Sequence, residues 1–415
     1  MRVATVFFTL PFSASRSGGC GGSRRPAFRT VSLYALLAGF ALFLCVSCGG
    51  GGSEPDAETT GPAAGEEPEE AGEPVEDIVA RMSVEELVGQ MFVISAQSTE
   101  MDYYLEKMIR ERNIGGVLLF GYNMESEEGV RALTESAQRL SMETEPAVPM
   151  FFGVDHEGGE VSSAPWVEPF PAPAEVGAAG DPEAARRNAR AIGEQLSRAG
   201  INTDFAPVVD TGFGAAIGTR AYSDDPAVVS EMGGAAIRGF REAGVVSSAK
   251  HFPNHGPATS DSHEALPVID HDEQTIQTYD LPPFRAAVDA GVPMVMVGHL
   301  VYPAVDPENP ASLSETWIRT LREDLGFEGV VVTDDLAMSG ANGGRPPAEA
   351  AVRAVKAGND LLIISSPPEE QAEAYNAIVR AVRAGEIDEA GIRASVGRIM
   401  EVKREYSLHG ADGGF

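Results

Sequence analysis

Residues 245–267 read VVSSAKHFPNHGPATSDSHEALP, an apolar run that ends abruptly in a charged loop. Three of the seven histidines of the chain fall in this stretch, and its titratable side chains are Lys250, His251, His255, Asp261, His263 and Glu264. A strand that ends in so many titratable groups is typical of the rim of an active site. The sequence after about residue 75 repeats this pattern of an apolar strand followed by a polar residue.

Eight apolar runs of strand length follow one another, at 91–95, 116–120, 150–154, 203–209, 245–249, 294–297, 330–333 and 361–364. Amphipathic helical segments alternate with them, at 103–112, 127–141, 182–199, 226–243, 272–290, 314–325, 347–357, 369–384 and 388–405. Two further helical segments, 76–82 and 83–88, precede the first run, and Ser83 with Glu86 forms a capping box pattern. Eight β/α alternations predict an α/β fold of the (β/α)8 barrel type in a single catalytic domain. A doubly wound open sheet is the alternative, but no GxGxxG follows the first strand.

The N-terminal residues 1–48 have the pattern of a targeting segment. Val31–Val46 is an apolar run preceded by three arginines, with the length of a signal peptide core and too short for a membrane span. Val46, Ser47 and Cys48, followed by four glycines, resemble a bacterial lipoprotein cleavage site with Cys48 as the lipidated residue. We therefore expect an exported protein that is anchored to the cell membrane only through Cys48. An uncleaved anchor and ordinary secretion are the alternatives.

The composition limits the other partners. Residues 49–75 are rich in Gly, Glu, Ala and Pro and predict a disordered tether, followed by a catalytic domain at 76–407 and a flexible tail at 408–415. Five arginines and no acidic residue lie in 1–47, so 26 basic and 62 acidic residues follow, a net charge of −36. This charge argues against nucleic acid or anionic lipid as a partner of the folded part. All three cysteines precede residue 50, which excludes disulfides and cysteine-ligated metals from the folded part.

Polar residues follow five of the eight runs. They are Asp155, Asp210, Lys250 with His251, His299, and Asp334 with Asp335. Isolated polar residues after strands are often helix caps. The active sites of (β/α)8 barrels lie at the carboxyl ends of the strands, however, and five such positions in one barrel favour an active site.

The run GVVVTDD ends in Asp334 and Asp335. Asp335 is well placed to cap a helix, which leaves Asp334 as a free carboxylate at the mouth of the barrel. Such a carboxylate could be a nucleophile, a metal ligand or a structural acceptor, and the sequence pattern alone leaves these open.

The triplet Asp261-Ser262-His263 suggests an acid/base pair. In an extended loop residues i and i+2 project to the same side, so Asp261 could hold one nitrogen of His263 and favour its imidazolium form. The alternative is a surface triplet without function.

Two further features of the site concern cations and metals. Lys250 and Arg220 are cationic donors suited to sugar hydroxyls or to carboxylates, or they form a structural ion pair. His251 and His255 have the spacing of a zinc site on a helix, but Pro253 and Gly256 argue against a helix there. We therefore expect no metal.

Taken in order, several motifs resemble the family 3 glycoside hydrolases, in the single-domain bacterial β-N-acetylhexosaminidase form of their N-terminal barrel domain. The resemblance covers about residues 83–407, and its motifs are VGQMFV, IGGVLLF, GVDHEGGEV, NTDFAPVVD, IGTRAYSDDP, KHFPNHGPATSDSH, VMVGHL and LGFEGVVVTDDLAM. Each motif is weak alone, whereas the ordered set is specific.

The resemblance implies a retaining hydrolase of terminal β-linked N-acetylglucosamine in peptidoglycan or chitin fragments, without a cofactor. Asp334 would be the nucleophile and His263, assisted by Asp261, the acid/base. The sugar-binding positions of the family match Asp155, Arg220, Lys250 and His251, with Asp210 and His299 as weaker candidates. We expect a monomer whose substrate is a carbohydrate.

The chain departs from the family pattern at three positions. Glu160 stands where the family usually has Arg, Asn254 where it has Gly, and Pro257 where it has Asp. Asn254 can adopt a positive φ as Gly would, and Glu160 replaces a cation beside the pocket with an anion. The competing hypotheses are a β-glucosidase or a phosphorylase of the same family, a binding lipoprotein without turnover, and a metal-dependent hydrolase.

Overall fold

The computed structural model describes residues 73–263 and 265–408. The chain divides into two compact units, 1–67 and 68–415, and only the second contains described residues. The expected signal peptide, the lipidation site at Cys48, nearly all of the expected tether, and residues 409–415 lie outside the described residues. In the described part, no helix has both the length and the apolar character needed to cross a membrane.

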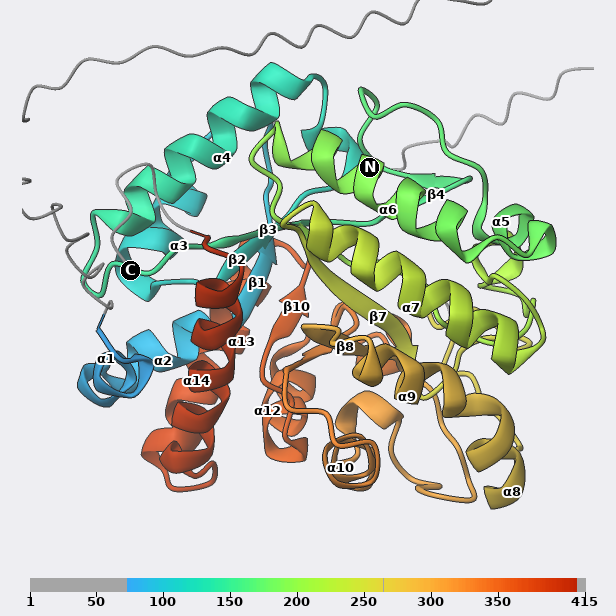
Figure 1. The fold of residues 1–415 in the computed structure, drawn as a ribbon. Coiled ribbons are helices and arrows are strands. Elements are labelled where there is room, and N and C mark those ends of the chain that lie inside the picture. Colours follow the sequence, from blue (N-terminus) through green and yellow to red (C-terminus); the bar gives the residue numbers. More distant parts are fainter. Residues whose placement is uncertain (1–72, 264, 409–415) are drawn as a thin grey trace, which may run out of the picture. The chain divides into compact units, whose positions relative to one another are not determined.

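Eight parallel strands form a nearly closed barrel, in the order β10-β1-β2-β3-β6-β7-β8-β9 (Figure 1). They are β1 (Phe92–Ser95), β2 (Gly116–Leu118), β3 (Phe151–Val154), β6 (Thr203–Asp204), β7 (Val246–Phe252), β8 (Met294–Val297), β9 (Val330–Thr333) and β10 (Leu362–Ile364). A bridge between Val332 and Leu361 joins the two outer strands, with Thr333 N donating to Leu361 O at 3.0 Å. The predicted (β/α)8 barrel is confirmed.

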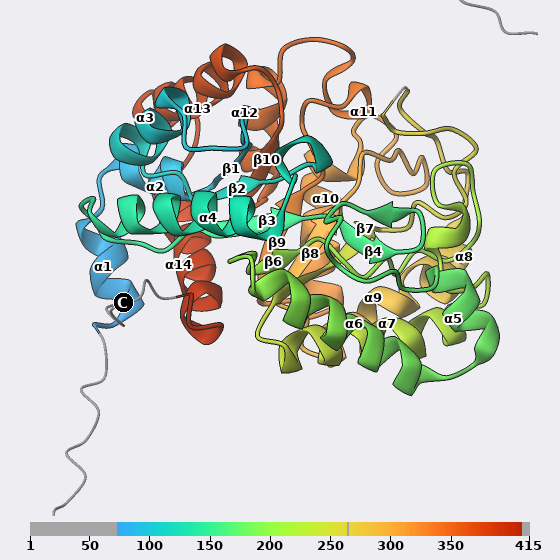
Figure 2. The same ribbon diagram turned by 90° about the horizontal axis from the view of Figure 1, so that it is seen from above.

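Helices surround the strands on the outside of the barrel (Figures 1 and 2). The longer ones are α3 (Tyr103–Arg112), α4 (Glu127–Met142), α6 (Pro182–Ser197), α7 (Pro226–Glu242), α9 (Pro282–Asp289), α12 (Ala348–Ala357), α13 (Pro368–Arg383) and α14 (Glu389–Glu405). Short helices α1 (Val75–Arg81) and α2 (Val84–Gln90) precede the first strand, and the capping box of Ser83 and Glu86 is present. Most of these bounds lie within two residues of the expected ones.

Two of the expected helices are interrupted. The segment 272–290 consists of α8 (Glu273–Thr275), the π-helical turn η3 (Ile276–Asp280) and α9, because the proline pair at 282 and 283 lacks the N–H groups that a continuous helix needs. The segment 314–325 consists of α10 (Glu315–Arg319) and a second π-helical turn, η5 (Thr320–Asp324).

Two strands have an end more than two residues away from the expected one. The fourth, β6, is shorter, since Pro207 cannot donate to the ladder and only a bridge from Val208 to Lys250 continues the pairing. The fifth, β7, continues to Phe252. Lys250 and His251 therefore lie on the strand itself and not in the loop after it.

The segment after β3 contains a hairpin that the sequence pattern did not predict. It is formed by β4 (His156–Gly158) and β5 (Val161–Ser162), and a short helix α5 (Pro173–Ala179) follows. Its turn needs glycine, because Gly158 and Gly159 have φ of 87° and 61° and a Cβ on Gly159 would lie 2.7 Å from Ala172 Cβ. The remaining short elements are η1 (Gly121–Asn123), η2 (Gly218–Arg220), η4 (Ala311–Leu313) and α11 (Ser339–Asn342).

Candidate active site

A cavity of about 260 Å³ opens at the carboxyl ends of the barrel strands. The titratable side chains along its wall include eight that come from four strand ends or the loops after them: Asp155, Glu157, Arg220, Lys250, His251, Asp261, His263 and Asp334. The sequence predicted seven of these eight, and the structure brings those seven together in one cavity. Glu157 was not predicted.

Asp334 follows β9 directly and is partly exposed in the cavity. Its backbone N–H donates to Val297 O at 3.0 Å, and its Oδ1 accepts from the N–H of Asp335 at 2.8 Å. Burial opposes ionisation of this carboxyl group, but the nearby His299 and His251, the Asp335 N–H and Lys250 outweigh it and lower its pKa to about 2. Asp334 is therefore an ionised carboxylate held in place by its backbone.

Asp335 does not cap a helix, contrary to the expectation from sequence. Its Oδ1 accepts from the N–H groups of Ala337 and Ser365, both at 3.0 Å, and its Oδ2 accepts from the Ser365 hydroxyl. These bonds tie the end of β9 to the end of β10. The structural role expected for this carboxylate is retained, but its partner is the neighbouring strand.

Glu157 is the centre of a buried ion cluster. Its carboxylate accepts two hydrogen bonds from Arg220, through Nε and an Nη, at 2.8 Å each, and its Oε1 lies 2.8 Å from Lys250 Nζ. Lys250 Nζ also donates to Asp155 Oδ1 at 2.5 Å. Burial would raise the pKa of Glu157, but Lys250 and Arg220 outweigh it and lower the pKa to about 2. The two predicted cations are thus fixed by carboxylates.

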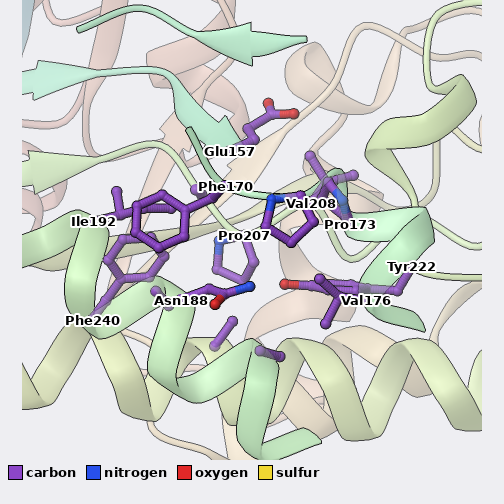
Figure 3. A pocket seen from close by; sticks show the side chains of 15 residues that line it. Glu157, Phe170, Pro173, Val176, Asn188, Ile192, Pro207, Val208, Tyr222 and Phe240 are labelled. Atoms are coloured by element: carbon purple, nitrogen blue, oxygen red, sulfur yellow. The ribbon is translucent and has the colours of Figure 1, made fainter. Parts of the chain in front are cut away.

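Apolar side chains lie beneath Glu157. They line a small cavity of about 30 Å³. In Figure 3, Phe170, Pro207 and Val208 lie below the Glu157 carboxylate. Only 1% of the Glu157 side chain is exposed. A carboxylate in such surroundings is tolerated only when it is paired and hydrogen-bonded, as this one is.

A signal in the sequence could have identified Glu157. It lies two residues after Asp155, so the two side chains project to the same side of an extended segment. The same argument paired Asp261 with His263. Two cations expected at neighbouring strand ends also require buried anions to compensate them.

Asp210 is fully buried and lies behind His251. Its Oδ2 accepts from His251 Nδ1 at 2.7 Å, and its Oδ1 accepts from the His255 N–H at 2.6 Å. The bond from His251 Nδ1 fixes the tautomer of that ring and leaves its Nε2 as the nitrogen free for other partners. Asp210 is not among the described residues that line the cavity, so it acts through His251, which differs from the direct sugar contact expected.

His299 also lies behind the cavity wall. Its Nε2 donates to the carbonyl oxygen of Asp335 at 3.0 Å, and its Nδ1 contacts the Ser312 hydroxyl at 2.7 Å. Burial lowers the pKa of this ring. His299 supports the segment that carries Asp334, and the described lining of the cavity does not include it.

Asp261 and His263 form the expected pair. Asp261 Oδ1 accepts from His263 Nδ1 at 2.8 Å and from its backbone N–H at 2.9 Å. Both side chains line the cavity, and 70% of the His263 side chain is exposed. Because Nδ1 is held by a carboxylate, Nε2 is the nitrogen available for proton transfer.

Ser262 anchors this pair to the barrel. It is buried, its hydroxyl contacts His255 Nε2 at 3.0 Å, and its carbonyl oxygen accepts from the Gly340 N–H at 3.0 Å. A Cβ on Gly340 would lie 2.9 Å from that oxygen. The loop that bears the pair is therefore attached through Ser262 to the segment just after β7 and to the segment after β9.

Of the three departures from the family pattern, Asn254 is the most deeply buried. Its Oδ1 accepts from the Thr211 N–H at 2.9 Å, and its Nδ2 donates to Asp280 Oδ1 at 2.7 Å. The suggestion that it takes a positive φ is wrong, since among the described non-glycine residues only Asn113 and Ser407 do so. Its side chain instead links the ends of two strands to η3.

Glu160 lies in the turn of the hairpin and is exposed. Its Oε1 accepts from the Thr219 hydroxyl at 3.0 Å. Its neighbour Val161 and the neighbour of Thr219, Arg220, both line the cavity. No group of three or more His, Cys, Asp or Glu suited to a metal ion occurs in the described part of the chain, and His251 and His255 lie on or just after β7.

Residues 83–402 match the family described as "Glycosyl hydrolase family 3 N terminal domain". The chain is similar to "Beta-hexosaminidase" of Methylobacillus flagellatus, 35% identical over 293 residues that cover 68% of this chain and 81% of that protein. It is also similar to "Beta-hexosaminidase A" of Pseudoalteromonas piscicida, 32% identical over 335 residues, or 74% of this chain and 56% of that one.

Among solved structures, the chain is similar to a glycoside hydrolase family 3 beta-N-acetylglucosaminidase from Paenibacillus sp.. The TM-score is 0.77 at 37% identity, covering 79% of this chain and 63% of that one. The chain thus spans less than two thirds of the Pseudoalteromonas and Paenibacillus proteins, but most of the Methylobacillus one. Together these similarities indicate a glycoside hydrolase.

Proposed function

Because this chain belongs to glycosyl hydrolase family 3, we propose that it is a retaining β-N-acetylhexosaminidase that removes terminal β-linked N-acetylglucosamine from glycans. One observation carries the proposal. The ionised Asp334 and the Asp261–His263 pair line the same cavity at the carboxyl ends of the strands. A nucleophile and a proton donor in one cavity are the two groups that retaining glycoside hydrolysis needs.

In the first step, an Asp334 oxygen attacks the anomeric carbon through a transition state with oxocarbenium character. The bond from that carbon to the leaving oxygen breaks, and Nε2 of the protonated His263 gives its proton to that oxygen. The products are the glycosyl ester of Asp334, the free leaving sugar and a neutral His263. Asp261 stabilises the imidazolium before the transfer and keeps Nε2 aimed outward.

In the second step, a water molecule gives a proton to the neutral His263 while its oxygen attacks the anomeric carbon. The ester bond to Asp334 breaks, and the sugar leaves with its original β configuration. The low pKa of Asp334 makes it a stable carboxylate leaving group at this stage. The enzyme is thereby regenerated, with Asp334 ionised and His263 protonated by the proton from water.

The ion cluster is suited to holding the terminal sugar. Lys250 and Arg220 are fixed by Glu157 and donate from rigid positions, and the partly exposed Asp155 can accept from sugar hydroxyls. His251 adds the nitrogen left free by Asp210. Fixed donors and acceptors of this kind position a substrate at little entropic cost.

The cellular place of the enzyme is part of the proposal and rests on the sequence pattern around Cys48. We place the protein outside the cytoplasm, attached to the membrane by a lipid on Cys48, as a monomer that needs no cofactor. Mass spectrometry of membrane-extracted protein would detect the lipid. An unmodified mature N-terminus in the culture medium would contradict it.

The test of the activity compares the nitrophenyl β-N-acetylglucosaminide with the β-glucoside, using protein that begins after Cys48. We expect release from the N-acetyl sugar, and a loss of at least about 10⁴-fold in Asp334→Ala with an unchanged melting temperature. Proton NMR should show the β anomer as the first product. Preference for the glucoside, or a requirement for phosphate, would contradict the proposal.

A further inference from the structure

Exposed large apolar side chains gather at the catalytic end of the barrel. Among the described residues there are five: Tyr103, Tyr122, Phe213, Leu266 and Val268. Each lies in a segment that follows a strand, after β1, β2, β6 or β7, and such segments form the carboxyl end of a (β/α)8 barrel. Scattered exposed apolar residues need no explanation, but their restriction to one end indicates a contact surface.

Phe120 and Tyr122 connect this surface to the cavity. Their rings are stacked, with centroids 5.7 Å apart and an interplanar angle of 20°. Phe120 lines the cavity, whereas 58% of Tyr122 is exposed. The Tyr122 hydroxyl donates to Ala96 O at 3.1 Å, which fixes the ring. A rigid aromatic face therefore extends outward from the site, of the kind that packs against the C–H face of a pyranose ring.

The charge of the cavity and its rim is negative. Five acidic side chains line it, those of Asp155, Glu157, Asp261, Asp334 and Asp335, against the cations Lys250 and Arg220 and the His263 ring that is protonated before the first step. Lys250 and Arg220 are already bonded to Glu157, and Lys250 is also bonded to Asp155. An incoming carboxylate would thus find each of these two cations already neutralised.

Glu160 extends this negative charge to the rim. It projects from the hairpin next to Val161 and is held by Thr219. The loop that carries Thr219 contacts the loop before the Asp261–His263 pair, through Gly214 N to Gly256 O at 2.7 Å and Ala215 N to Ala258 O at 3.0 Å. The hairpin, this loop and the catalytic loop therefore form one continuous rim. The leaving sugar must pass this rim, because His263 protonates the oxygen that it carries.

We propose that the leaving side of the site selects an uncharged chain of β-linked N-acetylglucosamine, as in chitin, and disfavours a leaving sugar that bears a carboxylate, as in peptidoglycan. Tyr122 supplies the stacking surface and Glu160 the repulsion. This inference rests on the proposed function and names the substrate class for the same site.

The test measures kcat/KM on three disaccharides with the same terminal sugar. They are chitobiose, N-acetylglucosaminyl-N-acetylmuramic acid, and the methyl amide of the latter, which lacks the charge but keeps the shape. We expect the wild type to cleave the amide about 3- to 10-fold faster than the acid at about 0.01 M salt, and the two nearly equally at about 1 M salt.

Substitutions at position 160 should change this ratio. Glu160→Gln should reduce the preference for the amide about threefold, and Glu160→Arg should abolish or reverse it. Glu401→Gln is the matched control, because it removes one exposed charge from α14, beside the loops that precede β8 and β9 at the opposite end of the barrel. An unchanged ratio in Glu160→Arg, or an equal change in Glu401→Gln, would overturn the electrostatic part.

Substitutions at position 122 test the stacking part. Tyr122→Ala should raise KM for chitobiose about fivefold or more while KM for the nitrophenyl substrate changes less, and Tyr122→Phe should keep most of the affinity. Glu401→Gln, at the opposite end of the barrel, is the control here as well. If Tyr122→Ala raises KM for chitobiose and KM for the nitrophenyl substrate equally, the stacking role of Tyr122 is overturned.

Failure of the proposed function gives a different pattern of results. If the wild type hydrolyses none of these substrates, the proposed activity is wrong. Calorimetric binding of the acid and of its amide then still measures the selectivity of the rim. Tighter binding of the acid than of the amide would overturn the inference in that case as well.

Discussion

The carboxylate of Glu157 holds the guanidinium of Arg220 through two parallel hydrogen bonds of 2.8 Å each, and the ammonium of Lys250 contacts the same carboxylate. The three side chains come from the hairpin after β3, from η2 and from β7. One residue that does not belong to the reacting groups therefore sets the position of both cations.

Glu157→Gln should impair both catalysis and stability. The amide keeps the shape but leaves Arg220 without its carboxylate and Lys250 with Asp155 alone. Removing one partner of a buried pair costs about 3–5 kcal/mol. Displacement of Lys250 and Arg220 by about 1 Å should lower kcat/KM about 100-fold. Chemical denaturation and nitrophenyl kinetics measure the two effects. Glu373→Gln, which breaks the exposed pair with Arg380, is the control and should stay near wild type.

The same residue should contribute to acid denaturation. The pKa of Glu157 is about 2 in the folded protein and about 4.5 when it is unperturbed, so its stabilisation is complete above pH 4.5 and is lost as the pH falls toward 2. Over that range the unfolded state binds the proton first, and stability falls by up to about 1.4 kcal/mol per pH unit from this group. A denaturation series from pH 5 to pH 3 should show a shallower slope in Glu157→Gln than in the wild type. Equal slopes would mean that folding does not lower the pKa of Glu157.

His263→Ala should affect poor leaving groups most. Protonation of the leaving oxygen is worth about 10²–10⁴-fold for a sugar hydroxyl and little for a dinitrophenolate. We expect a loss of that size on chitobiose and a much smaller one for dinitrophenol release in the first turnover. Asp261→Asn should show the same pattern with a smaller amplitude. An equal loss on both substrates would remove the acid role from His263.

Ser262→Ala should weaken the acid step without removing the acid. The hydroxyl contacts the buried His255 at 3.0 Å, and its loss leaves that imidazole nitrogen unpaired, at a cost of about 1–3 kcal/mol. We expect a fall in kcat on chitobiose of about tenfold, with a smaller change on the dinitrophenyl substrate. Ser262→Thr, which restores a hydroxyl, should recover most of the rate. A substitution that lowers stability but leaves the ratio between the two substrates unchanged would limit Ser262 to a structural role.

The sequence predicted the features that depend on local pattern. The alternation of strands and helices gave the barrel, and the position of Asp334 after VVVT placed it at the mouth, because both follow from periodicity and chain order. The pair Asp261 and His263 was predictable because its two members are two residues apart. Their contact needs no knowledge of the rest of the fold.

The features that escaped prediction depend on contacts between distant segments. Whether Lys250 binds Asp155, Glu157 or a sugar depends on β3 and β7 lying on either side of β6, which no local pattern shows. The positions of Asp210 and His299 at strand ends predicted that both side chains line the cavity. Tertiary hydrogen bonds to His251 and to the Asp335 carbonyl oxygen turn them away from it.

Lys403 gives a prediction that is independent of the active site. This lysine of α14 is buried, donates to Gln90 Oε1 at 2.8 Å and lies 4.9 Å from the centroid of the Phe151 ring. Burial lowers its pKa from 10.5 to about 7. Between these values the unfolded state carries a proton that the folded state lacks, so wild-type stability should rise with pH by up to about 1.4 kcal/mol per unit from this group.

Lys403→Met should remove this slope, because methionine has a similar length and no charge to bury. The variant should be more stable than the wild type at pH 7, and the difference should shrink as the pH approaches 10, where an uncharged amine no longer opposes folding. Denaturant unfolding at pH 7, 8.5 and 10 measures the effect, with the exposed Lys356→Met as control. If the unfolding free energy of Lys403→Met rises with pH as steeply as that of the wild type, Lys403 keeps its proton in the folded protein. Its contacts with Gln90 and Phe151 would then be those of a buried cation.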